Sequence, residues 1–190
     1  MEAVTMHSVG KLVLLAGGLM LLGATSALAQ AHSPQEHTPH VAQVVALDEC
    51  DPATFNAALG PGECKNIAAG YSTVLSDFIA EAAAGTPNPG WDIEPDTLNI
   101  KKGTTVIVSD QGGEIHTFTE VAQFGGGFIP VLNAPGESVV PECAGGFSTV
   151  AVAKTRILQG SEVHVTELSK GEHRFQCCLH PWMRMKVEVK

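Results

Sequence analysis

The C-terminal stretch FQCCLHPWMRMKVEVK, residues 175–190, places a thiol, an imidazole and a thioether within one short loop. On either side of that loop, apolar and polar residues alternate, as expected for strands with one buried face. Phe175 and Cys177 share one face before the loop, and residues 185–189 alternate in the same way after it. The stretch therefore predicts two strands joined by a loop that carries metal-binding side chains.

The donor atoms in this loop favour a particular class of metal. Thiolate and thioether sulfur together with imidazole select copper, zinc or iron over magnesium or calcium. One thiolate, two imidazoles and a weak axial thioether make up the blue-copper site. Cys177, His180 and Met183 supply three of these four groups. A second histidine must therefore come from elsewhere in the chain.

The spacing Cys177-x-x-His180-x-x-Met183, followed by Arg184 and a closing strand, resembles the ligand loop of the cupredoxins. Its Cys-x-x-His-Pro-x-Met-Arg form is most similar to the amicyanin type, because the plastocyanin type has a longer gap between histidine and methionine. In this family the other histidine ends a strand that follows a Gly-Thr-x-Val segment, and here His116 follows the sequence GTTV. The resemblance covers roughly residues 91–190. It implies one type 1 copper ion, cycling between Cu(I) and Cu(II), with His116, Cys177, His180 and Met183 as ligands.

Alternatives for the ligands and the metal stay open. Met185 could replace Met183 as the axial ligand, although it shares the inward face of the closing strand with Val187. His164 and His173 are further histidines on expected strands, but no motif supports them. Zinc is the alternative metal, and this donor set suits it poorly because structural and catalytic zinc sites rarely use a thioether.

Two positions differ from the family pattern. Thr117 stands where the family often has Asn, whose side chain ties the two ligand segments together. Cys178 stands where the family often has Ser or Thr. Hydrogen bonds around a sulfur ligand tune its metal, so the reduction potential does not follow from the sequence.

Five cysteines stand at positions 50, 64, 143, 177 and 178. If Cys177 is the copper thiolate, as the resemblance implies, four remain to pair in an oxidising compartment. Cys50 and Cys64 close a short loop and are the natural pair, which leaves Cys143 for Cys178. Adjacent strand residues point to opposite sides, so Cys177 can face the site while Cys178 faces away. Other connectivities remain possible from the sequence.

The N-terminal region has the sequence pattern of an export signal. An apolar run over residues 12–22 follows Lys11, and Ala27-Leu28-Ala29 supplies a small-x-small cleavage pattern. This predicts a signal peptide over residues 1–29 and a periplasmic or extracellular protein. The run is too short for a membrane span, which needs about 20 apolar residues. No membrane span is expected after cleavage.

The next two segments differ from a minimal cupredoxin. Residues 30–45, which contain His and Pro, predict a disordered leader, although its histidines could loosely collect metal. Residues 46–90 predict a disulfide loop and a helical extension. An amphipathic helix is expected over residues 71–84, ending before Gly85, because apolar side chains recur there at helical spacing.

Residues 91–190 predict a cupredoxin-like domain of short strands separated by turn residues, without a βαβ rhythm. Strands are expected over residues 97–100, 104–109, 116–120, 147–153, 162–166, 172–177 and 186–189. The pattern is all-β, and the resemblance narrows it to a Greek-key β-sandwich with an N-terminal helical extension. A long loop over residues 124–143 is expected to be functional or mobile.

The chain has 20 acidic and 11 basic residues and a formal net charge of −9, which argues against nucleic-acid binding and favours basic partners. No catalytic acid–base pair, nucleophile triad or phosphate loop is present, so no enzymatic activity is expected. The resemblance implies a one-electron carrier that docks transiently with redox proteins, with His180 beside Pro181 and Trp182 as the exit for the electron. A non-redox periplasmic copper carrier, a copper-stabilised structural module, or a domain serving a larger oxidase or reductase is the alternative.

Overall fold

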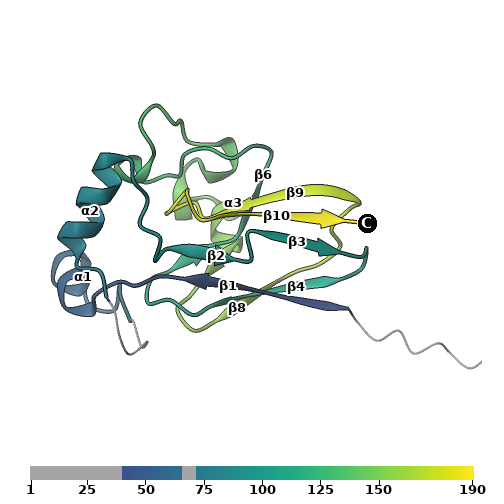
Figure 1. Cartoon of the computed structure of the whole chain (residues 1–190), viewed down its shortest axis with the longest axis horizontal. Helices are drawn as coiled ribbons and strands as arrows, with labels where there is room; N and C mark the ends of the chain where they lie inside the picture. The colour runs from purple at the N-terminus through teal and green to yellow at the C-terminus, as the bar shows by residue number, and fades with distance from the viewer. Residues whose placement is uncertain (1–39, 66–71) are drawn as a thin grey trace, which may run out of the picture. The chain divides into compact units, whose positions relative to one another are not determined.

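The computed structural model describes residues 40–65 and 72–190 (Figure 1). The predicted signal peptide and most of the predicted leader lie outside these residues. The strands are β1 (Val41–Leu47), β2 (Asp92–Glu94), β3 (Thr97–Ile100), β4 (Thr105–Asp110), β5 (His116–Thr117), β6 (Thr119–Val121), β7 (Arg156–Ile157), β8 (Glu162–Val165), β9 (Gly171–Gln176) and β10 (Arg184–Val189). The helices are α1 (Pro52–Leu59), α2 (Leu75–Ala84) and α3 (Val150–Lys154), with 3-10 turns η1 (Pro130–Leu132), η2 (Pro141–Cys143) and η3 (Gly146–Ser148).

Two mixed four-stranded sheets form a cupredoxin-like sandwich. The first has the strand order β2-β1-β4-β8, with β1 parallel to β4, and the second has the order β3-β10-β9-β6, with β10 parallel to β3. Figure 1 shows β1, β4 and β8 below β3, β10 and β9. Alternate residues of β4 and β10, such as Val106 and Val187, are fully buried in one core shared by both sheets. The alternation that predicted the closing strand is therefore the packing pattern of that core.

The strand β1 corrects two predicted boundaries. Residues 41–45 were expected to be disordered leader, and the sandwich was expected to begin at residue 91. Instead, residues 41–45 form most of β1, and β1 pairs with both β2 and β4. Val44 and Ala46 are buried while their neighbours are partly exposed. The partner residues of β1 lie at least 45 residues later in the chain, so the local sequence does not indicate that residues 41–45 pair as a strand.

The helical extension follows β1 and lies at the end of the strands opposite the C-terminus (Figure 1). The predicted helix is present as α2, which ends at Gly85 in the left-handed conformation. A second helix, α1, was not expected. The Asp51 side chain caps it by accepting the Thr54 N–H at 2.8 Å, and Pro52 occupies its first turn. Phe55 is its buried anchor.

The predicted strand over residues 147–153 is wrong. This segment lies in η3 and α3, and η3 begins at Gly146 directly after Gly145, two glycines with positive φ. The alternation of small and apolar residues is too short to separate strand from helix. Val152 is buried here in a second cluster that contains the Cys178 sulfur. The turn at Gly145 and Gly146 and the burial of Val152 in this cluster favour a helix over a strand for this segment.

Both expected disulfides are present. Cys50 is bonded to Cys64 and Cys143 to Cys178, which leaves Cys177 as the free, buried cysteine. The predicted long loop, with η1 and η2, is thereby attached to the end of β9. In the described part of the chain, no helix has the length and hydrophobicity needed to cross a membrane.

Candidate metal centre

The sandwich brings three of the predicted ligands together at the end that faces the helices. His116 begins β5, Cys177 follows β9, and His180 lies in the turn that leads into β10. One donor atom from each lies within 4.8 Å of the other two, and all three residues are buried. The cluster combines two strands with one loop, so the sheet register sets its geometry.

Both imidazoles present the same nitrogen to the sulfur. The Nδ1 atoms of His116 and His180 each lie 3.9 Å from the Sγ of Cys177. The turn is held by its own backbone, since the Cys177 N–H donates to the Met183 carbonyl and the Met183 N–H donates to the His180 carbonyl, each at 3.0 Å. The short spacing seen in the sequence is therefore that of a closed turn.

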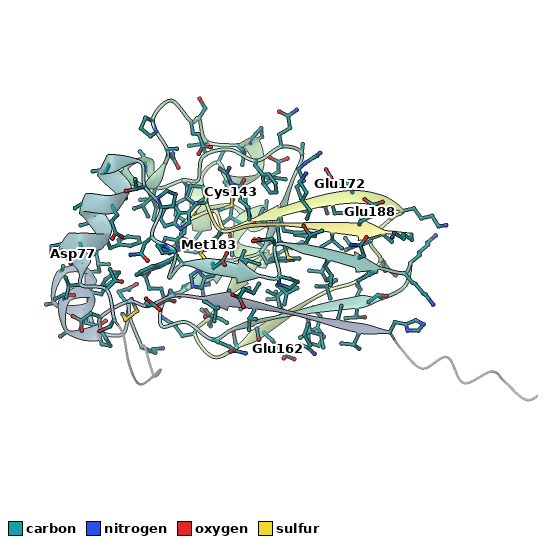
Figure 2. The ribbon with its side chains drawn as sticks, in the orientation of Figure 1. Asp77, Cys143, Glu162, Glu172, Met183 and Glu188 are labelled. Atoms are coloured by element: carbon teal, nitrogen blue, oxygen red, sulfur yellow. A yellow bond between two sulfur atoms is a disulfide. The ribbon has the colours of Figure 1, made fainter. Side chains whose placement is uncertain are left out.

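The two methionine candidates occupy different environments. Met183 belongs to the closed turn and is fully buried in the interior, where Figure 2 labels it. Met185 is also buried, but it lies on β10 opposite Phe175 of β9. The position of Met185 is thus that of an ordinary core residue of the sheet, whereas Met183 is bonded through its backbone to both Cys177 and His180.

The other two histidine candidates lie away from the cluster. His164 is an exposed residue of β8 whose Nε2 is 2.8 Å from Glu162. His173 is on β9, with Nδ1 2.6 Å from Glu120. Each ring therefore has a carboxylate partner in its own surroundings, and neither belongs to the group that contains Cys177.

A carboxylate lies behind each imidazole of the cluster. The Nε2 of His116 is 3.0 Å from the Oδ2 of Asp48, and both side chains are fully buried. The Nε2 of His180 is 3.6 Å from the Oε2 of Glu114, which also accepts the indole N–H of Trp91 at 2.7 Å. Sequence reasoning missed Asp48, Glu114 and Trp91, because isolated acidic and aromatic residues carry no motif.

Contacts within the cluster shift the pKa values of Cys177 and His116 in opposite directions. Burial raises the pKa of the Cys177 thiol, but hydrogen bonds with His116 and His180 outweigh burial and bring the pKa well below its usual value. Burial lowers the pKa of His116, but its bonds with Asp48 and Cys177 outweigh this and raise the pKa to about 10. The metal-free site therefore favours a thiolate, which is the form of cysteine that binds metal.

A third carboxylate lies close to the same histidine. The donor atoms of Asp48, Asp110 and His116 lie within 4.8 Å of one another. Asp110 accepts the Gly112 N–H through Oδ1, whereas its buried Oδ2 has no hydrogen-bond partner in the described structure. Burial raises the pKa of Asp110 to about 7. His116 thus has two buried carboxyl groups beside it, and of the two only Asp48 has a lowered pKa.

Thr117 links the two ligand segments. Its hydroxyl accepts the Cys178 N–H at 2.7 Å, and its own N–H points at the Cys177 sulfur at 3.4 Å. The Thr119 hydroxyl in turn donates to that of Thr117 at 3.1 Å. A hydroxyl can therefore make the connection that the resemblance assigned to an Asn side chain.

The ring of His180, the expected exit for the electron, is covered by other side chains. Only 2% of the residue is accessible. Phe78 of α2, Trp91 and Trp182 surround the ring, with centroids 5.9, 6.3 and 5.6 Å from its own. Phe78 belongs to the helical extension, and Trp91 directly follows it in the chain.

A small surface pocket lies next to this aromatic cover. Its volume is about 110 Å³, and Trp182 forms part of its wall together with Pro181. The remaining wall comes from the end of α2 and from the long loop, including Ala82 and Leu132. Trp182 is only partly buried, so it connects the covered histidine with the surface.

Comparison with known proteins adds likenesses of fold. The sequence matches no protein-family model and no curated protein. A purple cupredoxin from Nitrosopumilus maritimus matches 78% of this chain and 99% of its own, at 14% identity and a TM-score of 0.40. A reduced amicyanin variant matches 51% of this chain and 71% of its own, at 22% identity and a TM-score of 0.33. A Cu(I) amicyanin variant matches 52% of this chain and 73% of its own, at 20% identity and a TM-score of 0.34.

Proposed function

We propose that this cupredoxin-like chain binds one type 1 copper ion and carries single electrons between redox proteins. His116, Cys177 and His180 are the strong ligands, and Met183 is the weak axial ligand. The observation that carries this proposal is the buried cluster in which two Nδ1 atoms each lie 3.9 Å from one sulfur. One metal ion can bridge such separations, because bonds from a metal to thiolate and imidazole measure about 2.3 and 2.0–2.1 Å.

The donor set fits copper in both oxidation states, and bound copper supplies a one-electron redox couple. The protein supplies the rest. The closed turn from Cys177 to Met183 and the Thr117 hydroxyl hold the ligands in place, while the aromatic cover of His180 excludes water. A rigid and dry set of ligands changes little when the charge of the metal changes. These features support electron transfer over loose metal storage.

The burial of the cluster supports a carrier rather than an enzyme. His116 and Cys177 are fully buried and His180 is nearly so, which leaves a substrate little access to the ligand atoms. An electron can still leave through packed rings, and the Trp182 ring lies 5.6 Å from that of His180. We place transient docking of a redox protein over Trp182 and Pro181. The acidic net charge favours a basic partner.

Export to the periplasm or the extracellular space belongs to the same proposal. The two disulfides support it, because such bonds persist in oxidising compartments. The predicted signal peptide over residues 1–29 would direct the chain there. Residues 30–40 would then form the leader, and the sandwich would begin with β1.

The test is an optical and EPR spectrum of the purified, copper-loaded protein, with cyclic voltammetry of the same sample. We expect an intense visible absorption from the thiolate–copper bond and a reversible one-electron wave. A protein that binds copper without colour and without a reversible wave would instead be a copper carrier or a copper-stabilised module.

The axial position should tune the potential rather than hold the metal. Met183→Leu deletes the sulfur and roughly keeps the volume, a change that cores usually tolerate at a cost below about 1.5 kcal/mol. Copper should stay bound, because thiolate and imidazoles supply most of the binding. Loss of the fourth donor and gain of an apolar neighbour should favour Cu(I), the ion of lower charge, by roughly tenfold, which raises the potential by about 59 mV.

Met185→Leu is the matched control, since Met185 is equally buried but packs within the sheet. Its potential and EPR spectrum should stay nearly unchanged. A shift with Met185→Leu and none with Met183→Leu would assign the axial position to Met185 and contradict the short loop spacing.

A further inference from the structure

The segment that precedes the ligand motifs contributes directly to the surroundings of both histidines. Asp48 follows β1 and lies 68 residues before His116 in the chain, yet its Oδ2 is 3.0 Å from the His116 Nε2. Phe78 and Trp91 come from the same segment and cover His180. The described residues between 41 and 91 therefore form more than an appended pair of helices.

Asp48 is held in position from several sides. Its Oδ1 accepts the Cys50 N–H at 3.1 Å, and its Oδ2 accepts the Glu114 N–H at 2.8 Å as well as facing His116. The Cys50–Cys64 disulfide anchors the chain just after it. A Cβ at Gly112 would meet the Asp48 Oδ2 at 2.0 Å, so only glycine permits this approach. The carboxylate thus has little freedom to leave the imidazole.

Glu114 has the corresponding place behind His180. Its Oε2 accepts the Trp91 indole N–H at 2.7 Å and lies 3.6 Å from the His180 Nε2. Trp91 is itself fixed, with only 1% exposure and its ring 4.5 Å from that of Phe78. The distance of 3.6 Å is too long for a hydrogen bond, so Glu114 acts on His180 mainly through its charge.

We propose that Asp48 and Glu114 are positioning residues that complete the copper centre, a role that rests on the proposed function. Each directs the Nε2 of one imidazole away from the metal, which leaves the two Nδ1 atoms for copper. Their negative charges, buried where solvent screens them little, favour Cu(II) over Cu(I) and lower the reduction potential. Asp48, from the segment before residue 91, thereby acts together with Glu114 on the potential of ligands that lie after residue 91.

The geometry makes the two carboxylates unequal. Asp48 combines a hydrogen-bond distance with full burial, whereas Glu114 is slightly exposed and stands 0.6 Å farther from its imidazole (3.6 against 3.0 Å). Removing the charge of Asp48 should therefore have the larger effect. Loss of partners that orient metal-bound histidines typically changes metal affinity by about 10–100-fold.

The test compares Asp48→Asn and Glu114→Gln with the unchanged protein by cyclic voltammetry and by separate Cu(I) and Cu(II) affinities. We expect Asp48→Asn to lower the Cu(II) affinity relative to Cu(I) by about 10–100-fold, a rise of about 59–118 mV. Glu114→Gln should shift the same ratio by less than about tenfold. Glu162→Gln is the matched control, because Glu162 pairs with the exposed His164, and it should shift nothing.

A second readout needs no variant. Long-range ¹H–¹⁵N NMR of the Cu(I)-loaded protein should show protons on the Nε2 of both His116 and His180, with the His116 proton exchanging slowly. Slower exchange at His116 than at His180 would report the Asp48 hydrogen bond even if Asp48→Asn does not fold, and equally fast exchange at both would contradict it. Slow Nε2–H exchange in a protein without a reversible wave would overturn the electron-carrier function and leave the positioning role intact.

Two results would overturn the proposal. The first is a metal bound through Nε2 of either histidine. The second is an unchanged Cu(II)-to-Cu(I) affinity ratio in folded Asp48→Asn and Glu114→Gln proteins, which would reduce both carboxylates to a purely structural role.

Discussion

Cys177→Ser is expected to abolish the visible absorption of the copper-loaded protein and its reversible redox wave. The Cys177 sulfur is the atom that both imidazoles face, each at 3.9 Å. A serine hydroxyl has nearly the same shape but stays protonated, so it cannot replace a thiolate whose pKa the site has lowered. The measurement is an absorption titration with Cu(II), followed by EPR.

Cys178→Ser is the control, because it changes the adjacent residue but not the ligand. It should keep the colour and lose the disulfide with Cys143. Removal of a native disulfide typically costs about 2–5 kcal/mol, so this variant should unfold at lower denaturant concentration. A coloured Cys177→Ser protein would contradict the assignment of the thiolate.

Trp91→Ala should cause the largest loss of stability among the substitutions considered. Trp91 is almost completely buried, stacks on Phe55 at 6.1 Å and contacts Phe78 at 4.5 Å. Truncation of a buried tryptophan typically costs about 3–5 kcal/mol. It also removes part of the cover of His180 and the N–H that holds Glu114. Urea denaturation of the metal-free protein measures the first effect, and the EPR spectrum of the copper form measures the second.

Trp91→Phe separates packing from hydrogen bonding. The phenyl ring keeps most of the aromatic contacts with Phe55 and Phe78 but cannot donate to Glu114. An unsatisfied buried group typically costs about 1–3 kcal/mol, so this variant should fall between the unchanged protein and Trp91→Ala. If Trp91→Ala lost less than about 1 kcal/mol, the extension would not be packed on the centre as described.

The covered histidine changes how an electron would reach a partner. In this fold the turn Cys177–Met183 brings His180 to the end of the sandwich, but α2 and Trp91 close over it. The partly buried Trp182 is then the contact between the centre and the surface. Electron exchange with a partner should therefore depend on the Trp182 ring rather than on an exposed imidazole edge.

The sequence by itself determined the features that neighbours in the chain control. The spacing of Cys177, His180 and Met183 is a property of one turn, and two backbone hydrogen bonds close it. Alternation over residues 185–189 follows from the pleat of a strand whose inner face meets the core. Opposite orientation of Cys177 and Cys178 separates the free thiol from the disulfide. These relations span a few residues, so a local pattern is enough to find them.

Only the tertiary structure decided which distant residues complete the centre. Asp48 reaches His116 across 68 residues, and β1 pairs with a strand more than 55 residues later. The cover of His180 depends on how α2 packs, and the segment over residues 147–153 becomes helical against a disulfide that closes elsewhere in the chain. A single carboxylate or aromatic residue has no periodicity and no motif. Its role arises only when folding buries it beside a particular imidazole, where desolvation makes that one contact strong.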